Sequence, residues 1–569
     1  MALPWHIPLE SAISHKIKKT AAPQPSLFKH YCNINIHQPP CEELQMGLMC
    51  DIGMTVARLN IRNMEPDACA QLIQSIRQAV YNYSAELEYV YPLALIVDVK
   101  GPDIVTGDLK GGPKSTVDLI QSNSIRLTTD TSWRESGSPD CLYIGYDHLT
   151  DLQPNDLIYI DSLTPGMIKL VVTEVGDDSV DCTIAFGGTI GPKMTVRVTQ
   201  VPREVEPVAK EGSSDSLNCN EKIQEPFEDM QEQVNWAIGS DIDAVLVPAA
   251  ETVKDIGVVK ELLLEKGKHI LVIACIETVL GYDNLDEILA EADGLYIDRC
   301  VLGTDLPLEK IFIAQKTITA KCNEAGKPCI FKAVINEQLP TLCVTDIANL
   351  VLDGVDVIAL ELHYASPSSK SPRSHDSVRM AEHCLSAASL ICRQAERIIW
   401  QPYVYGNTEL MQSTFDEPTK AISINAVELA MRARANVIIC LTNSGRTAKL
   451  IAHARPHCPI IAVTRACHTA RQLRFWRGVR SVHYFEVAKS NWTAEVEARV
   501  SAALDYCKAK RLLRAGDAYV LVTGSRRGVG YCDSGAVPRK RIGKELCYQS
   551  HGLKSTYPLQ SASKEIALA

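Results

Sequence analysis

Two buried runs separated by a helix-like stretch decide the fold class, namely Met54-Thr-Val-Ala-Arg-Leu-Asn60 and Leu93-Ala-Leu-Ile-Val-Asp98. The first run belongs to an almost continuously apolar stretch over residues 46–60, which we interpret as two buried strands back to back. Residues 65–81 between the runs have helical character. A strand, a helix and a second strand in this order predict the start of a parallel α/β layout.

The rest of the chain adds two further kinds of pattern. Short alternating runs separated by Gly, Pro and Asp turns fill residues 103–205 and predict an inserted all-β domain. After it the α/β rhythm resumes, with strands expected at 243–247, 270–276, 293–298, 328–333 and 355–360. Three later strands, at 436–441, 459–464 and 518–523, alternate with helices and predict a doubly wound C-terminal α/β domain.

These patterns divide the chain into seven parts. We expect an N-terminal segment at 1–45, the first α/β part at 46–102, the β-domain at 103–205, the second α/β part at 206–372 with a linker at 208–225, a connecting helical segment at 373–416, the C-terminal domain at 417–533 and a mobile tail at 534–569.

Composition narrows the class of protein. The chain has 569 residues, of which 46% are hydrophobic and 22% charged, and a length of this order implies roughly three to five domains with enough apolar material for several cores. The formal net charge of −10 gives no nucleic-acid footprint. Because no stretch reaches the ~18 to 20 consecutive apolar residues of a membrane span, we expect a soluble cytoplasmic protein.

Two Gly-rich turns near the C-terminus follow buried strands. In Cys440-Leu-Thr-Asn-Ser-Gly-Arg-Thr447 a strand runs into a Ser/Gly turn and then a helix, which places backbone N–H groups, hydroxyls and an arginine where phosphate binds favourably. A second strand ends in Val522-Thr-Gly-Ser-Arg-Arg-Gly-Val-Gly530. Two such loops at the carboxyl edge of one sheet would converge on a polyanion. The alternative is ordinary turn chemistry with solvated arginines.

Polar residues also end the strands of the first α/β unit, and in a parallel barrel such ends form the working face. Arg58 is suited to pair a carboxylate or phosphate, and Glu277 offers the oxygen ligand that Mg²⁺ prefers. Asn60 and Asp98 end the two runs quoted first. The alternative is that each is a solvated strand terminus.

At this point the chain resembles the pyruvate kinase family, over about residues 28–532. The motifs that carry the resemblance, in matching order, are Met54-Thr-Val-Ala-Arg-Leu-Asn60, Asp98-Val-Lys-Gly-Pro-Asp-Ile-Val-Thr-Gly107, Phe312-Ile-Ala-Gln-Lys316, Cys322-Asn-Glu-Ala-Gly-Lys-Pro328, Asn349-Leu-Val-Leu-Asp-Gly354, Leu441-Thr-Asn-Ser-Gly-Arg-Thr-Ala448 and Pro459-Ile-Ile-Ala-Val-Thr-Arg465. The resemblance implies a TIM-type (β/α)8 barrel, an inserted all-β lid and a C-terminal α/β effector domain. It also implies a tetramer that moves the phosphoryl group of phosphoenolpyruvate to ADP with K⁺ and Mg²⁺.

Carried over residue by residue, the resemblance assigns roles in both parts. Arg58 matches the arginine that binds the substrate phosphate, Asn60 and Asp98 match two K⁺ ligands, and Glu277 matches one of two acidic Mg²⁺ ligands. The residues that match the family's sugar-bisphosphate site and its phosphate partners are Thr442, Ser444, Gly445, Arg446, Thr447, Trp492, Arg499 and Gly530.

The departures from the family pattern concern catalysis. The lysine that stabilises the transferring phosphoryl group is Cys275 here, the second Mg²⁺ carboxylate is Val301, and the threonine beside the substrate is Ala333. Arg62 replaces a K⁺-binding serine, and we hypothesise that a guanidinium there substitutes for the charge of K⁺. Because a preorganised donor is typically worth about 10²–10³ in rate, these changes predict that pyruvate kinase activity is strongly reduced or lost, unless Asp298 supplies the missing ligand.

One departure concerns the fold. Between Cys50-Asp-Ile52 and Gly53-Met54 the family has about twenty further residues, which this chain lacks. A parallel crossover needs about a dozen residues or more, so two strands back to back cannot be connected in the usual way. We therefore expect local remodelling of the barrel or a missing segment. Three functions stay open: a weakened enzyme of glycolysis, a non-catalytic paralogue that binds a phosphometabolite or joins an active partner in a hetero-oligomer, and a fold without a ligand.

Overall fold

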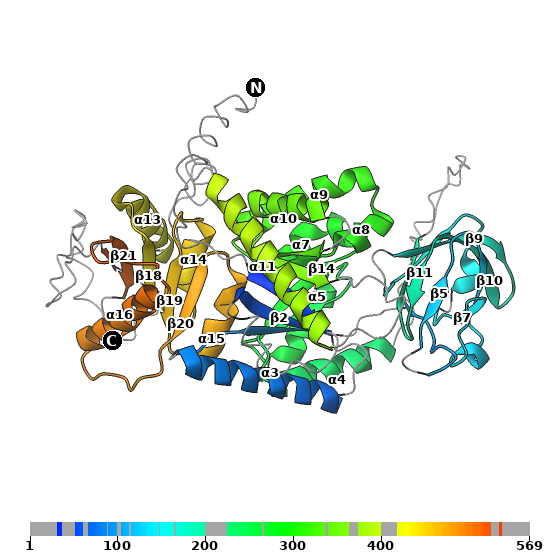
Figure 1. Ribbon diagram of the computed structural model, residues 1–569, viewed down its shortest axis with the longest axis horizontal. Helices are drawn as coiled ribbons and strands as arrows, with labels where there is room; N and C mark the ends of the chain where they lie inside the picture. The colour runs from blue at the N-terminus through cyan, green and yellow to red at the C-terminus, as the bar shows by residue number, and fades with distance from the viewer. Residues whose placement is uncertain are drawn as a thin grey trace, which may run out of the picture. The chain divides into compact units, whose positions relative to one another are not determined.

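The computed structural model describes residues 31–36, 50, 52–60, 66–87, 89–99, 104–112, 115–146, 148–163, 167–199, 225–264, 267–335, 340–362, 374–399, 418–524 and 534–536. These residues belong to two compact units. Unit 1 comprises residues 1–400 and 471–477, and unit 2 comprises residues 401–470 and 478–569. Figure 1 gives the labels of the elements.

Unit 1 contains a closed barrel of eight parallel strands, which confirms the predicted (β/α)8 class. In barrel order the strands are β1 Tyr31–Ile36, β17 Val357–Leu362, β16 Cys329–Ile335, β15 Gly294–Ile297, β14 Leu271–Ile276, β13 Ala244–Val247, β3 Ala94–Asp98 and β2 Met54–Asn60. All six residues of β14 are buried, as expected for a parallel strand that is covered on both faces.

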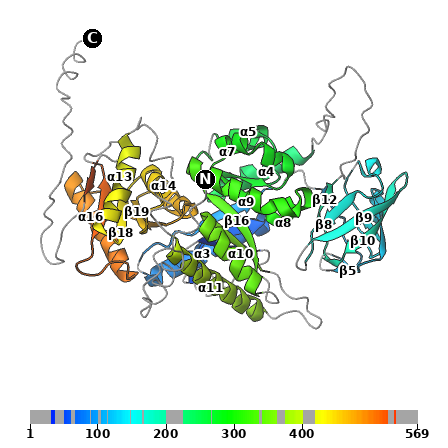
Figure 2. The same cartoon turned by 90° about the horizontal axis from the view of Figure 1, so that it is seen from above.

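Helices connect these strands and lie outside them (Figure 2). They are α3 Pro66–Leu87, α4 Glu225–Gly239, α5 Val253–Leu263, α6 Val279–Asp283, α7 Leu285–Glu291, α8 Arg299–Asp305, α9 Ile311–Ala325, α10 Pro340–Asp353 and α11 Ser374–Ile398, with a 3₁₀ turn at Leu308–Lys310. Helix α9 ends at Gly326, whose φ of 67° provides the left-handed cap that glycine adopts without strain.

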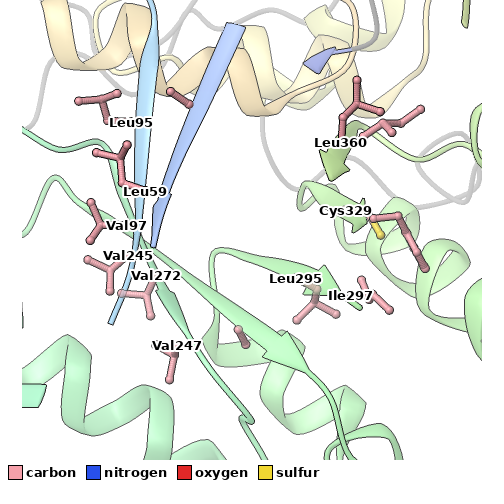
Figure 3. Close-up of a cluster of buried hydrophobic side chains, with 14 of the residues drawn as sticks. Leu59, Leu95, Val97, Val245, Val247, Val272, Leu295, Ile297, Cys329 and Leu360 are labelled. Carbon is pink, nitrogen blue, oxygen red and sulfur yellow. The ribbon is translucent and has the colours of Figure 1, made fainter. Parts of the chain in front are cut away.

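The barrel strands present two faces with different contents. Leu59, Leu95, Val245 and Leu295 are buried in one cluster together with helical side chains, so this face of each strand packs against the helices (Figure 3). Side chains alternate along a strand. The residues between them, such as Ile96, therefore face the barrel interior, and Arg58 and Asp98 share that inward parity because Arg58 pairs with Ile96 in the register.

The first barrel strand corrects one expectation. We expected strands back to back over residues 46–60, but the first strand is β1, which pairs with β2 and β17, while Cys50 and Ile52 are helical. A short apolar run does not distinguish a buried strand from a buried helix. Residues 37–53 connect β1 to β2 and exceed the roughly one dozen residues that a parallel crossover needs, so the crossover requires no further segment between Ile52 and Gly53.

The inserted β-domain lies between β3 and β13, as predicted, and also belongs to unit 1. Its strands are β4 Ile104–Val105, β5 Val117–Leu119, β6 Ser124–Thr128, β7 Cys141–Tyr143, β8 Leu157–Ile160, β9 Ile168–Val175, β10 Ser179–Phe186, β11 Gly188–Ile190 and β12 Thr195–Thr199, with 3₁₀ turns at Thr131–Trp133 and Leu149–Asp151. They form a seven-stranded sheet, β4-β12-β8-β9-β10-β6-β7, and a two-stranded sheet, β11-β5. Alternate residues of β10 are buried, which explains the alternating pattern of its sequence.

Unit 2 is an α/β domain with a five-stranded sheet in the order β20-β19-β18-β21-β22. Its elements, with the two that run into unit 1, are α13 Pro418–Ala433, β18 Val437–Leu441, α14 Arg446–His453, β19 Ile460–Thr464, α15 Cys467–Gln472, the 3₁₀ turn Leu473–Phe475, β20 Val479–His483, α16 Trp492–Ala509, β21 Tyr519–Thr523 and β22 Ser534–Ala536. Strand β22 pairs antiparallel with β21, so the first three residues of the expected mobile tail form a strand. The expected linker at 208–225 lies outside the described residues except for Glu225, where α4 begins.

Candidate functional site

Arg58 and Asp98 face each other at the carboxyl ends of β2 and β3. Arg58 Nε donates to Asp98 Oδ1 at 2.8 Å and Nη2 donates to Oδ2 at 2.5 Å, while Nη1 donates to the hydroxyl of Tyr296 at 2.5 Å. The guanidinium carbon also lies 4.5 Å from the centre of the Tyr296 ring. Asp98 is fully buried and the Arg58 side chain is 11% exposed. The two residues predicted to bind phosphate and K⁺ are therefore bound to each other.

Glu277 follows β14 and contacts Cys275 and Arg197. Its Oε1 accepts from the Cys275 thiol at 3.2 Å, and its Oε2 forms an ion pair with Arg197 Nη1, also at 3.2 Å. Cys275 is 1% exposed, and burial together with the nearby Glu277 carboxylate raises its pKa. The thiol therefore stays protonated, and no positive charge stands at the position that resembles the family lysine.

Asp298 follows β15 and caps the next helix. Its Oδ1 accepts from the backbone N–H groups of Cys300 and Val301, and its Oδ2 lies 2.7 Å from Lys332 Nζ. The neighbouring Arg299 turns the other way and forms an ion pair with Asp346 at 2.5 Å. Both oxygens of Asp298 thus already have partners within the protein.

Among the described side chains of the barrel mouth, the donor set does not fit a Mg²⁺ or K⁺ site. Val301 is an apolar residue with 6% exposure and Ala333 is buried, so neither offers an oxygen-bearing side chain. Asp98 and Glu277 hold guanidinium groups instead. Within the described ranges, no group of three His, Cys, Asp or Glu side chains is placed to hold a metal ion. The side chain of Asn60 and all of Arg62 lie outside the described residues.

Sequence reasoning missed three members of this cluster, namely Arg197, Tyr296 and Lys332. Arg197 belongs to β12 of the β-domain, and only the folded structure brings it to the barrel mouth. Lys332 did carry a signal, because it is a charged residue in the otherwise apolar strand Cys329-Ile-Phe-Lys-Ala-Val-Ile335, and a charge in a buried barrel strand is rare unless it is paired. Tyr296 carried none, since tyrosine is common in strands.

The predicted phosphate loop of unit 2 lies between β18 and α14. Gly445 is the N-cap residue of α14, with a φ of 81°, and no side chain caps the helix there. The hydroxyl of Thr442 accepts from the Gly445 N–H at 3.0 Å. Ser444 and Arg446 are exposed, whereas Thr447 is buried. The loop therefore has the predicted strand, turn and helix, while Gly530 of the second loop lies outside the described residues.

Trp492 and Arg499 both lie on α16 and have partners in unit 2. Trp492 Nε1 donates to the Gly524 carbonyl at 3.0 Å. Arg499 Nε donates to Glu495 Oε1 at 2.7 Å, and the same carboxylate holds Arg465 at 2.7 Å. Burial alone would raise the pKa of Glu495, but the hydrogen bonds from the Lys489 N–H and the two guanidinium groups lower it to about 2. The predicted phosphate partner Arg499 thus shares the Glu495 carboxylate with Arg465.

Together these features define a class: a multidomain α/β-barrel protein with an inserted β-domain, a cluster of paired charges at the barrel mouth and a separate α/β domain with a phosphate-type loop. The family model for the pyruvate kinase barrel domain matches residues 37–368, and that for the pyruvate kinase alpha/beta domain matches residues 420–537. The chain therefore belongs to the pyruvate kinase family.

Curated relatives agree over most of the chain. Human pyruvate kinase PKLR is 29% identical over 92% of this chain and 90% of its own length. The pyruvate kinase of Eimeria tenella is 30% identical over 86% and 85%, and that of Leishmania mexicana is 29% identical over 84% and 90%. Among the described residues, no helix is long and apolar enough to cross a membrane.

Proposed function

We propose that the barrel mouth of this chain has lost most or all of the reaction of its family, the transfer of a phosphoryl group from phosphoenolpyruvate to ADP. The observation that carries the proposal is the buried Cys275, a protonated thiol where the family pattern has a lysine. Phosphoryl transfer depends on positioning and on neutralisation of charge. A neutral thiol supplies neither an ammonium nor a strong donor to the transferring group.

Two further features of the mouth support the same conclusion. Val301 stands where the resemblance places the second Mg²⁺ carboxylate, and Arg58, which would bind the substrate phosphate, forms a bidentate pair with Asp98. Because one preorganised donor is worth about 10²–10³ in rate, the combined loss should leave turnover far below that of an active member. The weakened use of Mg²⁺ and K⁺ follows from the same residues.

The test is pyruvate formation by the purified chain from phosphoenolpyruvate and ADP, with Mg²⁺ and K⁺, with and without fructose bisphosphate. An active pyruvate kinase at equal concentration is the positive control, and circular dichroism establishes that the chain is folded. We expect no pyruvate above the rate without protein. Turnover comparable to the control would refute the proposal, since it would require a cation that the Cys275 position does not supply.

A second candidate function is that of a non-catalytic subunit that binds a phosphometabolite through unit 2. The observation that favours it is the uncapped N-terminus of α14 beside the Thr442 and Ser444 hydroxyls. Backbone N–H groups at a helix N-terminus suit phosphate. A sugar bisphosphate is the ligand that the resemblance suggests, and assembly with itself or with an active paralogue as a tetramer in the cytoplasm follows from the same resemblance.

This second function is tested by thermal shift and calorimetry with fructose bisphosphate and with inorganic phosphate. Ser444→Ala, with Arg446→Gln as a second variant, should weaken binding because each removes a polar group from the loop. Ser240→Ala is the matched control, because Ser240 follows α4 and its hydroxyl donates to the Trp236 carbonyl. Binding that is equal in all four chains would exclude the loop as the site.

A further inference from the structure

Three buried acids at the barrel mouth are each paired with a cation from another strand. Asp98 holds Arg58 of β2, Glu277 holds Arg197 of β12, and Asp298 holds Lys332 of β16. The exposed fractions of the acid side chains are 0%, 7% and 10%. The pattern is thus repeated at the carboxyl ends of three barrel strands, of which β14 and β15 are neighbours.

Buried carboxylates of this kind need a compensating charge at short range. Removal from water penalises an ionised group unless a cation and hydrogen bonds replace the lost solvation. Here the three cations lie at 2.5 to 3.2 Å from carboxylate oxygens. A metal ion would have to displace a fixed side-chain cation or bind beside it, and like charges at such distances repel strongly.

We propose that Arg58, Arg197 and Lys332 are built-in cations, so that the barrel mouth is balanced without Mg²⁺ or K⁺ and the Arg197–Glu277 pair fastens the β-domain to the barrel. The proposal uses the same mouth as the proposed function but does not depend on catalysis. It assigns roles to two residues, Arg197 and Lys332, that the resemblance to the family does not provide.

The surroundings of Arg197 agree with this role. Its side chain is 17% exposed and its Nη1 lies 3.2 Å from Glu277 Oε2. On β12 it pairs in register with Tyr159 of β8, two residues before Asp161. Burial raises the pKa of Asp161, and the nearby positive charges of Arg197 and Lys332 oppose that rise. Arg197 is therefore close to an acid of the β-domain, Asp161, and to an acid of the barrel, Glu277. This position suits a cation that links the two domains.

The metal part of the proposal is tested by titrating the folded chain with Mn²⁺ and measuring free Mn²⁺ by electron paramagnetic resonance. We expect no saturable binding by the wild-type chain and only weak binding by Val301→Asp, which restores the second carboxylate. Val301→Asp combined with Arg197→Met should bind Mn²⁺ at least about tenfold more tightly than Val301→Asp alone, because one repelling charge is removed. Val301→Asp combined with Arg126→Met is the matched control, since Arg126 pairs with Asp181 inside the β-domain.

Two outcomes would overturn the metal part. The first is saturable Mn²⁺ binding by the wild-type chain that Glu277→Gln abolishes, and the second is equal Mn²⁺ affinity with and without Arg197 in the Val301→Asp background. Neither readout uses turnover. A chain that binds Mn²⁺ but forms no pyruvate would therefore refute this inference and leave the proposed function standing.

The fastening role is tested by amide hydrogen exchange along β12 and at the end of β14. Arg197→Met and Glu277→Gln should each speed exchange in both strands, and the double variant should be no faster than the faster single variant. Additive acceleration would show that the two side chains act separately and would overturn the role. Arg197→Gln, which keeps a polar side chain, replaces Arg197→Met if the latter fails to fold.

Discussion

Glu495 provides the sharpest test of the charge network in unit 2. Its carboxylate accepts four hydrogen bonds, two from Arg465 at 3.0 and 2.7 Å, one from Arg499 at 2.7 Å and one from the Lys489 N–H at 2.9 Å. Glu495→Gln keeps the shape of the side chain and removes its charge. The variant therefore leaves two guanidinium groups without their counter-ion while changing almost no packing.

The expected cost follows from burial. Breaking a buried ion pair by removing one partner costs about 3–5 kcal/mol, and we expect about 3 kcal/mol because the Arg465 side chain is 29% exposed. Glu428→Gln is the control. It also removes a helical glutamate four residues before an arginine. In that pair the Glu428 side chain is 39% exposed and the Arg432 side chain 78% exposed, and such exposed pairs contribute about 0.3–0.5 kcal/mol to stability.

The same residue predicts a dependence on pH with a definite sign. The pKa of Glu495 is about 2 in the folded state, below its value in the unfolded chain, so the ionised form stabilises the fold. That contribution is present above the unfolded pKa and is lost as the pH falls from about 5 towards 2. Glu495→Gln has no such contribution to lose, so the difference in the free energy of unfolding between wild type and variant should become smaller over this range.

Urea unfolding at several pH values, read from hydrogen-exchange peptides of α16, measures both effects. The stabilising role of the Glu495 ion pairs is refuted if Glu495→Gln lowers the free energy of unfolding no more than Glu428→Gln does. It is also refuted if the difference between wild type and Glu495→Gln stays constant as the pH falls. The variant also tests the ligand site, because it releases Arg499 from its internal partner. Phosphate affinity should then rise although the domain is less stable, a combination that general damage to the fold would not produce.

Three further predictions concern single positions. Tyr296→Phe removes the hydroxyl that accepts from Arg58 and should lower the urea stability of unit 1 by about 1.5–3 kcal/mol, the range for a hydrogen bond to a charged group. Asp243→Asn removes a fully buried charge that pairs with two arginines of unit 1 and should cost about 3–5 kcal/mol. Asp286→Asn, at a carboxylate that is 75% exposed, should stay within about 0.5 kcal/mol in the same assay. Gly445→Ala forces a Cβ into the left-handed conformation at φ 81°, so we expect a loss of about 1 kcal/mol in unit 2 and weaker binding of inorganic phosphate in calorimetry.

Most of the fold was predictable because parallel strands covered on both faces have continuous apolar sequences. Strand β14 was expected at 270–276 and lies at Leu271–Ile276, and β18 was expected at 436–441 and lies at Val437–Leu441. Strand β1 was not predictable on this basis. Its sequence, Tyr-Cys-Asn-Ile-Asn-Ile, contains two asparagines, which are depleted in strands, and only its pairing with β2 and β17 identifies it.

The sequence indicated where the residues of the candidate site lie, but not which of them form ion pairs with each other. Strand ends of a barrel form its working face, which places Arg58, Asp98 and Glu277 correctly at one mouth. Which acid meets which base depends on the inward parity of each strand and on the β-domain, so the partners of Glu277 and Asp298 required coordinates. An ion pair between residues 80 positions apart, such as Arg197 and Glu277, has no signature in local sequence.

The arrangement of the barrel allows residues at its mouth to vary while the fold is kept. The stabilising cluster lies on the face of the strands that packs against the helices, and substitutions on the inward side at the carboxyl ends do not touch it. Such substitutions still have to satisfy the burial of Asp98, Glu277 and Asp298, which remain nearly inaccessible to water. A bound metal ion or a side-chain cation can supply the missing charge. Under the proposal, Arg197 and Lys332 supply that charge in place of a metal ion, and a buried thiol at Cys275 is compatible with a mouth that stabilises no transferring phosphoryl group.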